Sequence, residues 1–153
     1  MMWERRKPRS LYAKSTARIG THAMPHTRTE LLRNVYAAFA VGDVPTVLGA
    51  LAPGVRWVEP EGFPYAGTYT GPQAVLEGVF MRIGADWSTY ACQPHEYHEC
   101  ADTVFVLGDY DGTHRATGKS FHAPFVHVWR FDGEHAVAFA TYTDTALVQR
   151  AVG

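Results

Sequence analysis

Residues 27–83 show the spacing of apolar and polar positions that is typical of helices. In the first segment the apolar residues recur every three or four positions: Leu31, Leu32, Val35, Tyr36 and Phe39. The stretch TRTE at residues 27–30 matches a capping box and Gly42 is a candidate C-cap, so we predict a helix between them. Asp43 can cap a second, shorter helix in VPTVLGAL, and Pro72 can begin a third. The apolar stripe of this third helix is Val75, Leu76, Val79, Phe80 and Ile83.

A strand-like alternation interrupts these helices at PGVRWVEP, residues 53–60, where Val55, Trp57 and Glu59 share one face. Four longer strand-like runs follow, at about 88–100, 102–112, 119–131 and 134–144. Asp132-Gly133 is the strongest hairpin signal between them. Helices followed by a meander of antiparallel strands predict an α+β fold. We expect three helices packed on a strongly curved, mostly antiparallel sheet, which together form a cone with an apolar interior.

Length and charge divide the chain into two parts. The 153 residues, 46% of them apolar, fit one domain with a buried core. Residues 1–24 hold six basic residues against one acidic residue, a net charge of +5, and lack periodic apolar positions. We therefore expect residues 1–24 to be a disordered basic extension, either an anion-binding arm or a stretch upstream of a start at Met24. Residues 25–153 would then form the single domain.

The composition of the remaining chain excludes several classes of function. It carries eight basic and fourteen acidic residues, a net charge of −6, which argues against nucleic-acid binding. No apolar run approaches the roughly 18 residues of a membrane span. Cys92 and Cys100 form no metal or redox motif, and two thiols suit a reducing cytoplasm. Because phosphate loops, nucleophile elbows and calcium loops are all missing from the sequence, we expect neither a cofactor nor a metal.

Glu59 is the strongest candidate for chemistry, because a carboxylate is unusual on the apolar face of a strand. If that face is the concave side of the sheet, burial beside Trp57 and Phe63 would raise the pKa of Glu59, since desolvation penalises the charged form. A carboxyl group with a pKa near neutrality can act as a general base or acid. The alternative is a glutamate at the strand end that faces solvent or a turn amide.

The strand FHAPFVHVWRF, residues 121–131, is largely apolar on both faces, which predicts that both are covered. One face would line the cavity, and the other would contact a second subunit. His122 lies near the start of this strand and could reach a pocket mouth. His127 lies among aromatic residues on the opposite face. It could be a core or dimer-interface histidine, or a group that faces the pocket.

Four other polar side chains could take part in a site. Asp144 could cap a short C-terminal turn, or it could be a second acid in the pocket that assists a proton transfer. Tyr36 on the first helix, and Tyr65 and Tyr69 in the loop after the first strand, could each donate a hydroxyl group to a ligand oxygen. The alternative for each tyrosine is ordinary packing in the core.

The order helix, helix, strand, helix and four strands resembles the SnoaL-like branch of the NTF2-like superfamily, the relatives of ketosteroid isomerase and polyketide cyclases. The segments that carry the resemblance are VYAAFAVGDVPTVLGALAPGVRWVEPEG, YTGPQAVLEGVF and HAPFVHVWRFDGEHAVAF. The resemblance covers about residues 28–150. It implies an NTF2-like cone, a deep apolar pocket and a homodimer formed across the outer face of the sheet.

The resemblance also implies roles for single positions. Glu59 falls where the isomerases place their catalytic Asp, just before the Pro that ends the first strand. The position of their oxyanion Tyr falls on Val35, one residue before Tyr36, and that of their oxyanion Asp falls on Val126. With both donors replaced, the resemblance does not extend to steroid isomerisation. Epoxide-hydrolase chemistry of the limonene type needs an Asp-Arg-Asp set, and Thr141 replaces the Asp of the last strand.

We therefore expect a pocket that binds a small apolar molecule, with a carbonyl compound as one candidate, and no nucleic-acid or membrane partner. The residues predicted to contact the ligand are Trp57, Tyr36, Phe63, Tyr65, Tyr69, Val126, Phe139 and Thr141. The predicted catalytic residues are Glu59, Asp144 and His122. Three functions stay open: an isomerase- or cyclase-like enzyme that uses Glu59 as its base, a non-catalytic ligand-binding protein, and a dimeric scaffold.

Overall fold

A computed structural model of the chain describes residues 27–153, and the basic extension predicted at 1–24 lies outside the described residues. The helices are α1 (Arg28–Ala40), α2 (Val44–Gly49), α3 (Pro72–Val75), the π-helical segment η1 (Leu76–Phe80), α4 (Met81–Asp86) and α5 (Thr145–Val152). The strands are β1 (Leu51–Glu59), β2 (Gly67–Thr70), β3 (Trp87–Cys100), β4 (Thr103–His114), β5 (Ser120–Asp132) and β6 (His135–Thr143). The predicted order of helices and strands is confirmed.

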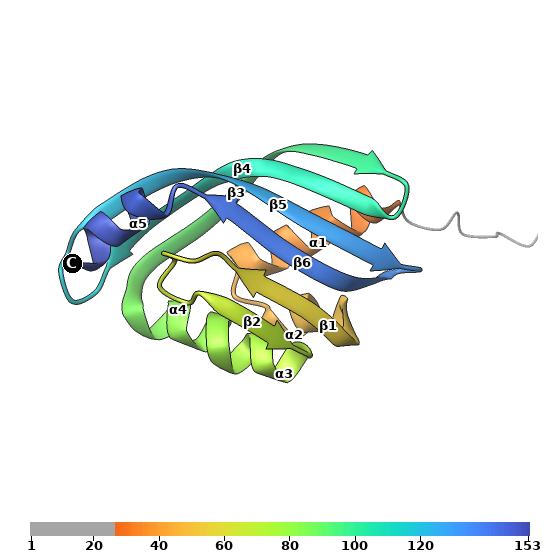
Figure 1. Cartoon of the computed structure of the whole chain (residues 1–153), viewed down its shortest axis with the longest axis horizontal. Helices are drawn as coiled ribbons and strands as arrows, with labels where there is room; N and C mark the ends of the chain where they lie inside the picture. The colour runs from red at the N-terminus through yellow and green to blue at the C-terminus, as the bar shows by residue number, and fades with distance from the viewer. Residues whose placement is uncertain (1–26) are drawn as a thin grey trace, which may run out of the picture.

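All six strands form one sheet in the order β2-β1-β6-β5-β4-β3. Every neighbouring pair is antiparallel except β1 and β6, which run parallel. The long strands arch over α1 and over the third helix, which consists of α3, η1 and α4 (Figure 1). The mixed α+β fold with a curved sheet is therefore as predicted, and the concave side of the sheet faces these helices.

The helix ends follow the predicted chemistry. Thr27 and Glu30 form the capping box of α1, and the Asp43 side chain accepts hydrogen bonds from the backbone and the hydroxyl group of Thr46. Gly42 follows α1 with φ +74°, a left-handed conformation that suits glycine and ends the helix.

Two features of the helices differ from the sequence prediction. The third helix is interrupted by η1, in which backbone hydrogen bonds reach one residue further than in an α-helix. The C-terminal segment forms a two-turn helix, α5, where the sequence indicated only a short turn. Asp144 caps α5, since its side chain accepts a hydrogen bond from the backbone N–H of Ala146 at 3.1 Å. Within residues 27–153 the structure contains no helix with the length and apolarity that crossing a membrane requires.

Strand β5 separates the interior from the outer face of the sheet. Its inward residues are buried: Phe121, Ala123, Phe125, His127, Trp129 and Phe131. On the outward face Val126 and Val128 are half-buried and Tyr142 of the neighbouring strand β6 is 62% exposed. The chain alone therefore leaves this outer face partly uncovered, and the homodimer across it stays a prediction.

Candidate functional site

A cavity of about 50 Å³ lies between the concave side of the sheet and the helices. Aromatic and aliphatic side chains from α1, α2, the third helix and strands β1, β3, β4, β5 and β6 form its wall. The half-buried lining residues mark its rim: Phe39, Phe80, Ile83, Tyr90 and Cys92. A site for one water needs about 10–15 Å³. With its walls in this arrangement the cavity therefore has room for a few waters or a very small organic molecule.

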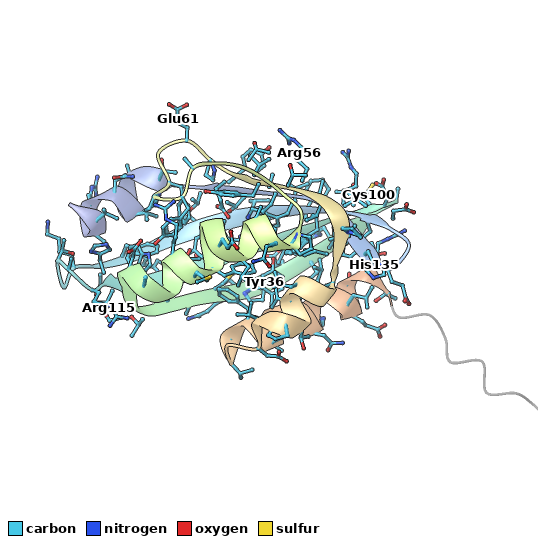
Figure 2. All side chains as sticks on the ribbon, turned by 90° about the horizontal axis from the view of Figure 1, so that it is seen from below. Tyr36, Arg56, Glu61, Cys100, Arg115 and His135 are labelled. Carbon is cyan, nitrogen blue, oxygen red and sulfur yellow. The ribbon has the colours of Figure 1, made fainter. Side chains whose placement is uncertain are left out.

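Glu59 is the acidic group in this cavity wall, at the inward-facing end of β1, and it is only 6% exposed. The indole N–H of Trp57 donates to Glu59 Oε1 at 2.7 Å, because positions two apart on a strand point to the same face. The other carboxyl oxygen, Oε2, is buried without a hydrogen-bond partner. Glu61, two residues further on, points away from the protein (Figure 2). The alternation along β1 therefore predicted the inward direction of Glu59 correctly.

Burial in this apolar wall raises the pKa of Glu59 from its usual 4.5 to about 8, and the Trp57 hydrogen bond opposes this only in part. Since Trp57 donates directly to this carboxyl group, its indole ¹H–¹⁵N resonance should shift with pH, with a midpoint near 8. The Glu59→Gln variant should show no such titration, and neither should the indole of Trp129, which donates to Tyr36 instead. A midpoint near 4.5 would mean that solvent reaches the carboxyl group.

A chain of hydrogen bonds crosses the part of the wall next to Trp57. Tyr36 contacts His127 Nδ1 at 2.6 Å, and Tyr110 contacts His127 Nε2. The indole of Trp129 donates to the Tyr36 hydroxyl oxygen at 2.9 Å, and Tyr110 and Thr141 are 3.1 Å apart at their oxygens. We call these five residues the His127 network. His127 is 4% exposed, so it faces the interior of its own chain and cannot face a dimer partner.

The hydrogen bonds of the His127 network fit either tautomer of a neutral imidazole. In one, Tyr36 accepts from Trp129 and donates to Nδ1 of His127, while Nε2 donates to Tyr110. In the other, Nδ1 donates to Tyr36 and Nε2 accepts from Tyr110. Burial favours the neutral imidazole, because it holds the pKa of His127 well below its usual 6.5. Each of the five residues therefore has a protein partner without a ligand.

Only three polar side-chain groups in the cavity wall lack a partner within residues 27–153. They are Glu59 Oε2, the hydroxyl group of Tyr90 and the thiol of Cys92. Burial raises the pKa of Tyr90 and of Cys92, so both stay protonated near neutral pH. The cavity thus offers a ligand one carboxyl oxygen and one hydroxyl donor, beside a neutral thiol.

Several residues predicted from the sequence do lie at this cavity or directly beside it. The lining includes Trp57, Glu59, Tyr36, Phe63 and Phe139, and the Phe139 ring stacks on Trp57 at 3.7 Å. Thr141 is 2% exposed and belongs to the His127 network, so it contributes to the wall indirectly.

Five other predicted site residues lie elsewhere. Tyr65 is buried, but its hydroxyl group donates to Asp86 at 2.9 Å, outside the cavity lining. Tyr69 packs over Gly78 of the third helix, where any side chain would overlap its ring, and its hydroxyl group donates to the backbone carbonyl of Tyr65.

The prediction that His122, Asp144 and Val126 reach the pocket is not met. His122 and Val126 lie on the outer face of the sheet, because alternate residues of a strand face opposite sides. His122 is exposed and contacts Asp111 at 2.8 Å. Asp144 follows the last strand, and its carboxylate serves as the cap of α5. The structure therefore brings none of these three side chains to Glu59.

Sequence analysis did not identify Tyr90, Tyr110 or Trp129 as site residues. Trp129 shares a face with His127, so strand alternation could have placed it inside. Tyr90 lies on β3, whose pairing with β4 shifts register between Trp87 and Thr89 and again between Pro94 and Glu96. Such bulges break the alternation on which the prediction depends, so no sequence signal indicated the side to which Tyr90 points.

Solved structures of NTF2-like proteins share this fold. One from Burkholderia thailandensis is 38% identical with a TM-score of 0.81, and the match covers 84% of this chain and 98% of that chain. An NTF2-like protein of unknown function from Burkholderia pseudomallei is 34% identical, with a TM-score of 0.76 and coverage of 82% and 96%. TerC, co-crystallised with polyporic acid, is 25% identical, with a TM-score of 0.75 and coverage of 82% and 97%.

A comparison of the sequence with models of protein families assigns the chain to a family, which is more specific than a shared fold. A model of the SnoaL-like domain matches residues 32–139, so the chain belongs to the SnoaL-like family. No curated protein matches the chain. The resemblance seen in the sequence is therefore confirmed at the level of family and fold, which are compatible with ligand binding or with cyclase or isomerase chemistry.

Proposed function

We propose that the protein binds a small apolar molecule in the cavity and transfers a proton to or from it through Glu59, as an isomerase- or cyclase-like enzyme. One observation carries this proposal. Glu59 lies in a cavity wall with Oε1 held by Trp57 and with Oε2 free of any protein partner. A buried polar atom without a partner is costly, and structural roles rarely leave one. Proton transfer to a ligand supplies a reason for keeping it.

The chemistry follows from the proton equilibrium of that carboxyl group. With a pKa raised to about 8, Glu59 is protonated in most molecules at pH 7 and ionised in a minority. The ionised form can remove a proton from a carbon next to a ligand carbonyl, and the electron pair of that C–H bond moves to the carbonyl oxygen. The protonated form can then return the proton to the same ligand at another carbon. A pKa close to the working pH favours both directions.

The size and polarity of the cavity support a small, uncharged substrate. The cavity of about 50 Å³ holds no steroid-sized molecule with its walls in this arrangement. TerC, a neighbour of the same fold, was co-crystallised with polyporic acid, so an organic ligand is compatible with this architecture. A larger ligand would require the rim side chains Phe80 and Ile83 to swing outward. The proposal gives His122 and Asp144 no part in the chemistry.

A solvent-exchange experiment tests the proton transfer without knowledge of the natural product. Cyclopentanone in D₂O exchanges the hydrogens beside its carbonyl group, and NMR follows their loss. We expect the protein to accelerate this exchange, with a rate that rises with pH around a midpoint near 8, because the ionised carboxylate is the base. Glu59→Gln should lower the rate by about 10²–10⁴-fold. Glu61→Gln, two residues away and exposed, is the matched control and should retain the rate.

The same experiment separates the alternative functions. A non-catalytic binding protein would bind cyclopentanone without exchange, and Glu59→Gln would change only the affinity. A dimeric scaffold of the same fold would show neither binding nor exchange for any ligand of this size.

A further inference from the structure

Tyr90 is a cavity residue whose ring is held in place by its neighbours. The ring lies 5.8 Å from Trp87, 5.7 Å from Tyr110 and 6.2 Å from Phe121, measured between centroids. Its strand partner is Gly112, where a side chain would lie 2.6 Å from the Phe121 ring and 3.1 Å from Trp87. The glycine thus lets the aromatic rings pack closely over β4. These contacts restrict the Tyr90 ring before any ligand arrives.

That hydroxyl group differs from those of the other tyrosines around it. Tyr36 and Tyr110 form hydrogen bonds with His127, and Tyr65 and Tyr69 donate to Asp86 and to a backbone carbonyl. Tyr90 makes no hydrogen bond to any residue in the described part of the chain, although the cavity that it lines is almost entirely apolar. Because Tyr90 is half-buried at the rim, its hydroxyl group is free to donate to a ligand that enters the cavity.

Glu59 Oε2 and the Tyr90 hydroxyl group complement each other when Glu59 is ionised, which is the minority form at pH 7 and the major form above pH 8. The ionised carboxylate then needs a hydrogen, and the Tyr90 hydroxyl group needs an acceptor. A ligand hydroxyl group can supply both, because its hydrogen can bond to Glu59 while its oxygen accepts from Tyr90. A carbonyl group with an acidic hydrogen on the neighbouring carbon can do the same. A carboxylate ligand would place a second negative charge beside Glu59, in an apolar wall where each buried charge is costly. An ammonium ion would leave Tyr90 without an acceptor.

We propose that Tyr90 is the oxygen-binding residue of the site and that the ligand is an uncharged carbonyl or hydroxyl compound, whose oxygen accepts from Tyr90 while its acidic hydrogen faces Glu59. This inference rests on the proposed function and adds to it the residue that binds the oxygen of the ligand. It also assigns a role to Tyr90, whose direction could not be predicted from the alternation of residues along its strand.

The test uses phenol and toluene, which have nearly the same shape and differ in the single oxygen. Both are larger than the cavity of about 50 Å³, so the rim side chains must move outward for either to bind. NMR titration of the full chain at about pH 9, where Glu59 is mostly ionised, should show tighter binding of phenol than of toluene. Tyr90→Phe should weaken phenol binding about three- to tenfold, the effect of one lost hydrogen bond, and leave toluene binding unchanged. Benzoate and isopropylammonium should not bind to either protein, and saturable binding of either ion in the cavity would overturn the assignment of the ligand class.

Thermal unfolding separates this role from a structural one. Tyr90→Phe removes a hydroxyl group that has no partner, so the melting temperature should stay the same or rise. Tyr110→Phe makes the same change in a hydroxyl group bonded to His127 and Thr141, and it should lower the melting temperature by several degrees. A comparable loss in Tyr90→Phe would overturn the proposal, because it would reveal a structural bond.

The two proposals fail in different ways. If Glu59→Gln changes phenol binding while Tyr90→Phe leaves it equal to wild type, only the role of Tyr90 is overturned. If phenol binds no better than toluene and Glu59→Gln has no effect on either ligand, the proposed function itself has failed.

Discussion

Glu59→Gln is expected to stabilise the protein above pH 8 by about 4 to 5 kcal/mol relative to wild type, which is a large share of the stability of a small domain. The native carboxyl group has a pKa of about 8, against 4.5 for an unfolded glutamate. Between these two values the folded state holds a proton that the unfolded state has released. The stability of the wild type therefore falls as pH rises from about 4.5 to 8, and glutamine removes that loss.

Urea unfolding at pH 5 and pH 9 measures this difference. At pH 5 the two proteins should agree within about 1 kcal/mol, because glutamine resembles the protonated acid and can still accept from Trp57. Glu61→Gln is the control, since its exposed carboxyl group should leave the pH dependence of wild type intact. If Glu59→Gln followed the same pH profile as wild type, Glu59 would not be buried as described.

His127→Phe should destabilise the protein by about 2–5 kcal/mol at neutral pH. Phenylalanine can keep the stacking on Phe125, whose ring centroid lies 3.9 Å from that of His127. It forms no hydrogen bond with Tyr36 or with Tyr110, so two buried hydroxyl groups lose a partner. Chemical unfolding measures the loss. His122→Ala, on the outer face of the same strand, is the control and should change stability by less than about 0.5 kcal/mol.

The stability of His127→Phe and that of the wild type should also respond differently to acidic pH. The native His127 stays neutral well below its usual pKa of 6.5, whereas the unfolded histidine takes up a proton there. The stability that it contributes is present above pH 6.5 and is lost as pH falls below that value, by up to about 1.4 kcal/mol per pH unit. His127→Phe should lack this part of the acid sensitivity. If the stability of His127→Phe fell below pH 6.5 as steeply as that of the wild type, this would argue against a neutral buried imidazole.

Much of the site could be predicted from strand periodicity, and the errors show where that logic stops. Alternation placed Trp57 and Glu59 on one face of β1, and that face proved to be the interior. On β5 the same logic separates Val126 from His127, but it cannot say which of them faces inward. The register supplies the answer, because His127 pairs with Thr141 and Val126 pairs with the exposed Tyr142. Register depends on pairing across the sheet, which one strand's sequence does not reveal.

The remaining parts of the site depend on contacts between distant segments. The His127 network joins α1, β4, β5 and β6, and none of its hydrogen bonds connects neighbours in sequence. Tyr90 follows a bulge, where the period of two is broken. The π-helical segment in the third helix also has no simple sequence signature. Three residues of the predicted apolar stripe, Val79, Phe80 and Ile83, line the cavity, although the sequence analysis did not name them as site residues.

The parallel pairing of β1 with β6 has a consequence for how the chain folds. Trp57 and Val58 find their sheet partners in Phe139 and Ala140, about eighty positions later, so the middle of the sheet closes only when nearly the whole chain is available. Until that step β1 has an open edge, and Glu59 stays hydrated with an ordinary acidity. Docking of the last strand therefore both completes the sheet and removes water from the acid. Conditions that ionise Glu59 should slow this final step, with little effect on the earlier pairing of β3, β4 and β5.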